Sequence, residues 1–235
     1  MESLAESLRI ALQLVISMDA DLGEVVILSL RVSFTALVIS SLIGLPLGAL
    51  LATTMFRGRN AVIILINALM GLPPVVVGLF VYMMLSNSGP MGWLQLLYTP
   101  TAMIIAQTIL ILPIVTALTR EIVENLDGEY RDFFESLCLS PPERLRALLW
   151  DARFSLLTVI LAGFGRAIAE VGAVIIVGGN INHLTRVMTS AIALETSKGN
   201  LPLAMALGII LLVIALTVNA LVSTLKTRHR EMTLA

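Results

Sequence analysis

Two residues of opposite charge, Arg166 and Glu170, lie within an apolar stretch and are the first candidates for chemistry. They are four residues apart, so on one helix they share a face and can form an ion pair. Each charge at the centre of a membrane-spanning helix costs about 2.5–3.5 kcal/mol, which the apolar neighbours barely offset. This face therefore needs a protein or water-filled environment. Two interpretations stay open: a salt bridge that locks a helix bundle, and the polar lining of a conduit in which Arg166 attracts an anion.

A second candidate is the helix start Ser140-Pro141-Pro142-Glu143. Ser140 can cap the helix, Pro141 suits its first position, and Glu143 stands where a capping box needs a carboxylate. The pattern predicts a helix over 141–151, preceded by a short helix over 129–137. Two short helices and a tight turn would form a knob on which a soluble partner could dock. A solvated linker is the alternative.

The elements that position these residues follow from composition. The 235 residues are 57% hydrophobic and 13% charged, with a mean hydropathy of +0.95, whereas a soluble domain carries about 25% charged residues. A net charge of −1 gives no indication of a nucleic-acid partner. The sequence therefore predicts an all-α integral membrane protein that is in contact with lipid.

Five apolar stretches have the roughly 20 residues that a membrane-spanning helix needs. They are residues 25–54, 61–85, 100–118, 155–177 and 201–225. A charged segment, 120–153, separates the third stretch from the fourth, and a mixed loop, 178–200, follows the fourth. We expect an amphipathic segment over 1–22, a transmembrane domain over 23–225 and a basic tail over 226–235.

The distribution of Lys and Arg predicts the orientation. With five crossings, one side of the membrane receives ten of these residues and the other receives four, with Arg166 inside a span. Because positive loops stay in the cytoplasm, we expect the N-terminus outside and the C-terminus and the 120–153 segment inside.

The ends and breaks of the helices carry further predictions. Residues 3–18 have apolar residues at helical spacing and predict a helix that either lies on the membrane surface or packs against the bundle. Gly44-Leu-Pro46-Leu-Gly48 is expected to interrupt the first span, although glycines four apart also allow helices to approach closely. Gly71-Leu-Pro73-Pro74 should break the second span, and Pro113 should kink the third.

Several kinds of site are not expected. His183 and His229 fall on opposite sides of the membrane, so they cannot share a metal. The single cysteine, Cys138, excludes an internal disulfide and is expected to pack. The chain has no phosphate-binding loop. We therefore expect no metal, no cofactor and no catalytic residue on this chain.

Two segments resemble the permeases of ABC importers. The run Asp132-Phe-Phe-Glu-Ser-Leu-Cys138-Leu-Ser140 resembles their cytoplasmic EAA loop, with Asp132 in place of the Glu, two phenylalanines in place of the alanines and Cys138 in place of the Gly. The run from Gly165 to Ala173, which contains Arg166 and Glu170, is similar to a segment of molybdate and sulfate permeases.

Three further runs resemble the tungstate-uptake subgroup, so that the resemblance spans about residues 24–225. They are Gly71-Leu-Pro73-Pro74-Val-Val-Val-Gly78, Gly178-Gly-Asn180-Ile, and Met188 to Gly199.

The resemblance implies a type I importer fold, a location in the cytoplasmic (inner) membrane of a bacterium or archaeon, and a set of partners. Two copies of the chain would enclose one pathway, two ATP-binding subunits would grip the loops, and an extracytoplasmic binding protein would deliver an oxyanion, tungstate first and molybdate or sulfate second. The implied ATPase contacts are Asp132, Glu135, Cys138, Ser140, Pro141 and Glu143. The implied pathway residues are Arg166, Glu170, Asn180, Gly71 and Pro73.

Two other classes of protein stay as alternatives. A membrane-embedded enzyme is disfavoured by the positions of the two histidines. A secondary transporter that works without an ATPase usually shows an inverted repeat, which five spans do not easily accommodate.

Overall fold

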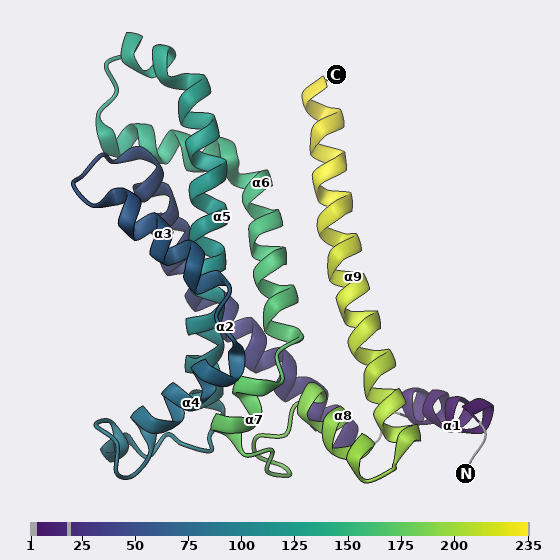
Figure 1. Cartoon of the computed structure of the whole chain (residues 1–235). Coiled ribbons are helices and arrows are strands. Elements are labelled where there is room, and N and C mark those ends of the chain that lie inside the picture. The colour runs from purple at the N-terminus through teal and green to yellow at the C-terminus, as the bar shows by residue number, and fades with distance from the viewer. Residues whose placement is uncertain (1–3, 18–19, 235) are drawn as a thin grey trace. The chain divides into compact units, whose positions relative to one another are not determined.

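The computed structural model of the chain describes residues 4–17 and 20–234, and this part is helical (Figure 1). The α-helices are α1 (Leu4–Ser17), α2 (Ala20–Thr53), α3 (Arg59–Met70), α4 (Pro74–Leu85), α5 (Pro100–Ser136), α6 (Pro141–Ile168), α7 (Gly172–Gly178), α8 (Met188–Ser197) and α9 (Leu201–Leu234). A short 3₁₀ helix, η1 (Gly92–Leu94), precedes α5. The all-α prediction is confirmed.

Four helices of the described residues are long and apolar enough to cross a membrane. They are α2 (from Asp21), α5, α6 and α9 (as far as Thr224). The count becomes five if α3 and α4 together form one span. The prediction of about five spans agrees with this count.

The charged segment 120–153 differs from the prediction. The expected helix over 129–137 is the last part of α5, which runs as one helix of 37 residues. The expected helix over 141–151 and the fourth span are likewise one helix, α6, of 28 residues. No proline lies between Pro113 and the end of α5, or after Pro142 in α6. Each helix therefore runs without a break through both its apolar and its charged part. The predicted pair of separate short helices is therefore wrong.

The predicted breaks have mixed outcomes. The break in the second span is confirmed, because α3 ends at Met70 and α4 begins at Pro74. The predicted interruption at Gly44–Gly48 is wrong, since α2 continues through Pro46. The α5 helix also continues through Pro113. In addition, the predicted loop 178–200 contains the helix α8.

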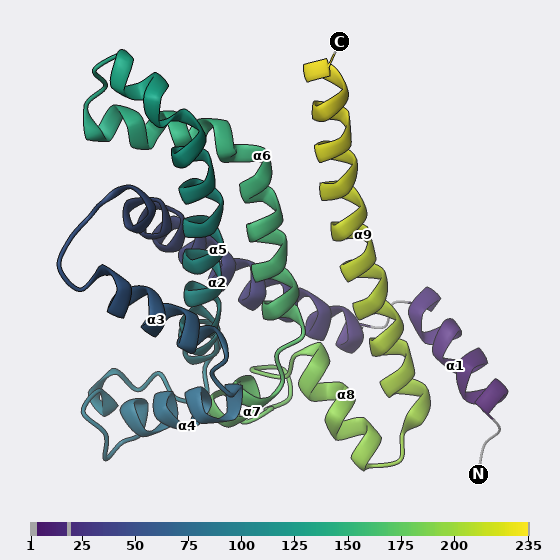
Figure 2. The same ribbon diagram turned by 45° about the horizontal axis from the view of Figure 1, so that its top comes forward.

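The contacts divide the chain into two units. Unit 1 is residues 1–36, 73–107 and 165–220, and unit 2 is residues 37–72, 108–164 and 221–235. In unit 1, α4 packs against α7 (Figure 2). A Cβ added at Gly78 would lie 2.7 Å from the Cα of Ala173, so these two backbones are in direct contact.

Unit 2 is built on a close contact between α2 and α5. A Cβ at Gly44 would lie 2.9 Å from Cγ1 of Val115, and a Cβ at Gly48 would lie 2.5 Å from the carbonyl oxygen of Thr116. The two glycines thus allow the close approach that their spacing predicts. Further along α2 and α5 lies an apolar cluster of Ala49, Ala52, Val123, Phe134 and Leu148.

The predicted N-terminal helix is present as α1. It buries Ser7 and Ala11, while Leu8 and Leu12 are exposed at 41% and 46%. One side of α1 therefore packs within the protein and an apolar side faces outward, which leaves its position at the membrane surface a prediction. Residues 1–3 and 18–19 of the predicted segment lie outside the described residues.

Candidate functional site

The first part of the candidate site is the break between α6 and α7. Arg166 lies in the last turn of α6, whereas Glu170 follows the end of that helix. The prediction that both residues lie in the middle of one span is therefore wrong. The ion pair itself is present: Nη2 of Arg166 lies 3.5 Å from Oε2 of Glu170. The Glu170 side chain is only 3% exposed, and that of Arg166 is 33% exposed.

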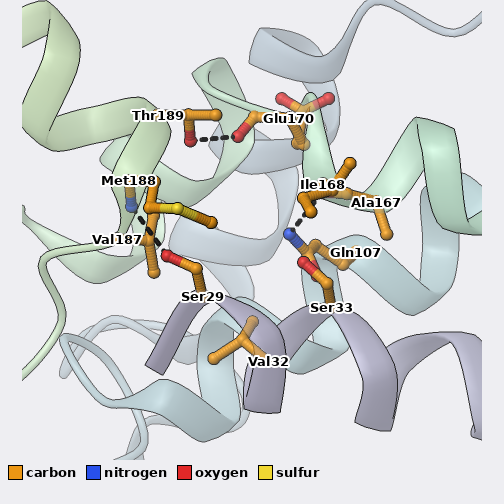
Figure 3. Close-up of a pocket in the computed structure, with 10 residues that line it drawn as sticks. All are labelled: Ser29, Val32, Ser33, Gln107, Ala167, Ile168, Glu170, Val187, Met188 and Thr189. Carbon is orange, nitrogen blue, oxygen red and sulfur yellow. Dashed lines mark hydrogen bonds between the residues drawn. The ribbon is translucent and has the colours of Figure 1, made fainter. Parts of the chain in front are cut away.

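Side chains satisfy the backbone groups that the break frees (Figure 3). Oε1 of Glu170 accepts a hydrogen bond of 3.1 Å from the N–H of Ala173 at the start of α7. The main-chain oxygen of Glu170 accepts one of 2.7 Å from the hydroxyl of Thr189. Gln107 of α5 donates from Nε2 to the carbonyl of Ala167 at 3.1 Å. Because a membrane offers no water to such groups, these bonds make the break possible.

A small cavity of about 10 Å³ lies at this break. It is lined by Ser29, Val32, Ser33, Gln107, Ala167, Ile168, Glu170, Val187, Met188 and Thr189. Oε1 of Gln107 is buried and has no hydrogen-bond partner among the residues that the structure describes. The volume suits one water molecule, which could donate to this oxygen. The cavity is too small for a tetrahedral oxyanion, so it is not an anion site.

Three residues of this site, Gln107, Ser29 and Thr189, were not predicted from the sequence. Ser29 of α2 accepts a hydrogen bond of 2.7 Å from the N–H of Met188 and thus joins α2 to the start of α8. A signal existed for Gln107 and Ser29, because a polar residue inside an apolar span usually faces the protein interior.

The other predicted pathway residues have structural positions of their own. Asn180 has a positive φ of 50°, and its Oδ1 accepts a hydrogen bond of 2.9 Å from the hydroxyl of Ser190 in α8. Pro73 precedes α4 in unit 1, and Gly71 ends α3 in unit 2. Unit 1 therefore contains Arg166, Glu170, Asn180 and Pro73 but not Gly71. Their roles in a pathway stay predictions.

The second part of the candidate site is the turn between α5 and α6, which we call the coupling turn (residues 132–143). All six predicted contact residues, Asp132, Glu135, Cys138, Ser140, Pro141 and Glu143, are exposed. Cys138 has a positive φ of 51° and is exposed, so the expectation that it packs is wrong. The predicted helix start is present: the N–H of Ser140 donates to Oε2 of Glu143 at 2.9 Å, and its hydroxyl donates to the same oxygen.

Residues on the inner side of the coupling turn hold it in place. Arg144 of α6 donates to Oδ1 of Asp127 in α5 from Nε at 2.5 Å and to Oδ2 from Nη2 at 2.6 Å. The guanidinium of Arg144 also lies 5.9 Å from the centre of the buried Phe134 ring. A bidentate ion pair of this kind fixes the orientation of the two side chains as well as the distance between them. These contacts fasten the turn to α5, and its exposed side carries polar residues together with the apolar Phe133 and Leu137.

A second group of charges fastens α3 to the same unit. Nη2 of Arg59 lies 2.8 Å from Oε1 of Glu124 in α5, and Arg120 pairs with the other oxygen of that carboxylate. Nε of Arg59 donates to the carbonyl of Leu51 at 2.8 Å. One carboxylate thus neutralises two arginines, and one of these arginines also binds the end of α2.

Known proteins resemble this chain over most of its length. The family of binding-protein-dependent transport system inner membrane components matches residues 44–231. The tungstate uptake system permease protein TupB of Peptoclostridium acidaminophilum is 39% identical over 96% of this chain and 99% of its own length. A probable anion ABC transporter permease protein of Haloferax volcanii is 40% identical over 88% of this chain and 91% of its own length. The sulfate transport system permease protein CysT of Escherichia coli is 26% identical over 83% of this chain and 73% of its own length.

The family match includes both halves of the candidate site, the coupling turn and the break at Arg166 and Glu170. It also agrees with the all-helical fold and the four to five candidate spans. The chain therefore belongs to the inner membrane components of binding-protein-dependent transport systems, the permease subunits of ABC importers.

Proposed function

We propose that this permease imports a tetrahedral oxyanion, with tungstate as the first candidate and molybdate or sulfate as alternatives. The support for the substrate comes from the relatives named for tungstate uptake and from the weaker similarity to a sulfate permease. The family works with an ATPase and a binding protein. We further propose that two copies of the chain pair in the lipid bilayer, that two ATP-binding subunits drive them, and that this chain needs no cofactor of its own.

The observation that carries the coupling role is the attachment of the turn between α5 and α6 to both helices. Its outer residues are exposed, while its inner residues are held by Asp127, Phe134 and Arg144. A partner that displaces the turn therefore moves two long helices rather than a loose loop. This is the property that an ATPase needs in order to transmit its closure to a permease.

The proposed orientation places the coupling turn in the cytoplasm and the N-terminus outside, in keeping with the ten-to-four distribution of Lys and Arg. Cys138 is the single cysteine of the chain and is exposed. Its labelling therefore shows on which side of the membrane the coupling turn lies. A maleimide that cannot cross membranes should label Cys138 in inside-out vesicles and leave it unlabelled in right-side-out vesicles.

The matched control for this labelling is Ser88→Cys in a Cys138→Ser background. Ser88 is exposed in the connection between α4 and α5, which the same topology places outside. Its labelling should follow the opposite pattern. Labelling of Cys138 in right-side-out vesicles would overturn the orientation.

The function is tested by reconstituting the permease with its ATPase and its binding protein in proteoliposomes. We expect ATP-dependent accumulation of tungstate, with molybdate and sulfate as competitors that rank the three anions. A photoactivatable cross-linker on Cys138 should capture the ATPase. Accumulation that is driven by an ion gradient without ATPase would instead favour a secondary transporter.

A further inference from the structure

Three side chains of the kinds that can ligate a metal ion, Asp21, Glu24 and His183, lie together in unit 1. Asp21 and Glu24 are three residues apart in the first turns of α2 and so share one side of that helix. His183 comes from the connection between α7 and α8. One ligand atom from each of the three residues lies within 4.8 Å of the other two.

The three side chains already form an organised group. Nδ1 of His183 lies 2.7 Å from Oε2 of Glu24, although the residues are 159 positions apart in sequence. The connection that carries His183 is fixed by hydrogen bonds from the N–H of Ile181 to Thr185 at 3.0 Å and from Thr185 to the carbonyl of Gly178. Thr185 is 1% exposed. A buried residue therefore sets the position of the loop that presents the exposed imidazole.

The donor set narrows the type of cation. Zn²⁺ binds both imidazole nitrogens and carboxylate oxygens, and its sites with three protein ligands keep a fourth, open position. Bonds of about 2.0–2.2 Å at tetrahedral angles place ligand atoms about 3.3 Å apart. All three residues are exposed, so small rotations of their side chains can bring the present separations to that value. The predicted topology separates His183 from the other histidine, His229, whereas the fold supplies His183 with two carboxylates.

We propose that Asp21, Glu24 and His183 form a binding site for a divalent cation of the Zn²⁺ type, which fastens the start of α2 to the α7–α8 connection. The cation takes the place of the hydrogen now shared between His183 and Glu24. Water completes its coordination.

The neighbouring charges are compatible with a cation. Arg186 is a positive group whose charge acts on His183, and its guanidinium donates to Oδ1 of Asn182 at 2.9 Å and to the carbonyl of Asn180 at 3.5 Å. With a neutral imidazole, the two carboxylates and this guanidinium leave a net charge of −1 around the site. Arg186 thus lowers the affinity without reversing the preference for a cation.

The test uses the full chain in detergent, without an affinity tag and freed of metals with a chelator. Isothermal titration with Zn²⁺ should show one site per chain. His183→Ala and Glu24→Gln should each weaken Zn²⁺ binding by about 100-fold or more. Loss of a residue that only orients a metal ligand costs about 10- to 100-fold in metal affinity. Asp21→Asn should also weaken it. His229→Ala, which changes the other histidine of the chain, is the matched control and should bind as the parent does.

A spectroscopic measurement keeps the proposal falsifiable if a variant is poorly folded. Co²⁺ bound to the parent chain should give the visible absorption of a low-coordinate site with a nitrogen ligand, and Zn²⁺ should displace it. Zn²⁺ should also raise the unfolding temperature of the parent and of His229→Ala, but not that of His183→Ala. A parent chain that takes up no Zn²⁺, or unchanged binding in His183→Ala, would overturn the proposal.

Discussion

Arg144 and Asp127 form a bidentate ion pair that joins the first turn of α6 to α5. Nε and Nη2 of Arg144 lie 2.5 and 2.6 Å from the two carboxylate oxygens of Asp127. The side chains are 23% and 13% exposed, so each charge depends on the other for much of its stabilisation. The planar guanidinium matches both carboxylate oxygens, which a lysine cannot do. The orientation of the coupling turn relative to α5 therefore depends on this pair.

Removal of the pair should destabilise the protein. Arg144→Ala leaves the Asp127 carboxylate mostly buried without a partner, and we expect a loss of about 2 kcal/mol in the free energy of unfolding. Arg144→Lys should recover part of it. Chemical denaturation in detergent measures both. Arg131→Ala is the control, because its pair with Glu135 is long, 4.0 Å, and exposed on both sides. An equal loss in that variant would contradict this role of Arg144.

The contact between α4 and α7 should not tolerate a side chain at Gly78. A Cβ there would lie 2.7 Å from the Cα of Ala173, so one backbone has to shift. We expect Gly78→Val to lower the thermal unfolding temperature and the yield of folded protein. Gly128→Ala is the matched control, since that glycine lies in α5 with no atom within 4 Å of its added Cβ. Alanine there should leave stability unchanged or raise it by about 0.5–1 kcal/mol. Equal behaviour of the two variants would refute the close contact.

The two interpretations of Arg166 and Glu170 predict different measurements. Glu170→Ala removes the acceptor of the Ala173 N–H, and an unpaired buried group costs about 1–3 kcal/mol. Glu170→Gln keeps an acceptor and should be more stable than Glu170→Ala. If Arg166 lines a conduit, Arg166→Ala should lower ATP-dependent anion uptake while the unfolding temperature stays close to that of the parent. A fall in both by the same variant would support the purely structural salt bridge.

The turn between α8 and α9 should be sensitive to acid. Hydrogen bonds from Lys198 at 2.8 Å and Asn200 at 3.0 Å to the buried Glu195 carboxylate lower its pKa, with the Lys198 contact as the larger cause. A lowered folded-state pKa adds stability above the ordinary pKa of Glu, about 4.3, which is lost as the pH falls through the folded value.

Hydrogen exchange measures this effect. The amides around Asn200 should stay protected at neutral pH and lose protection below about pH 4. Glu195→Gln should show little dependence on pH over the same range, because it carries no ionisable group. Equal acid sensitivity in the parent and in Glu195→Gln would assign the effect to other carboxylates.

Local patterns in the sequence correctly predicted helix starts, breaks and spans that depend only on neighbouring residues. The break before Pro74 follows from two prolines and a glycine, and the start of α6 at Pro141 follows from the Ser140–Glu143 pattern. The apolar stretches predicted the spans because bilayer thickness sets their length. These features need no knowledge of distant residues.

The end of α6 at Ile168 depends instead on distant residues. The run Ala167-Ile168-Ala169-Glu170 contains no helix breaker, so a continuous helix is the reasonable prediction. Gln107 and Thr189 bind the freed carbonyls from 60 and 19 positions away, and this tertiary contact overrides local preference. The pair of Arg59 with Glu124, 65 positions apart, is outside the reach of local patterns for the same reason.

The glycine contact between α2 and α5 has a mechanical consequence. At Gly48 the two backbones touch without intervening side chains, so neither helix can slide or rotate against the other without a steric clash. The second half of α2 and the middle of α5 must therefore travel together as one stiff body. A movement of α5 at this contact therefore has to carry the second half of α2 with it.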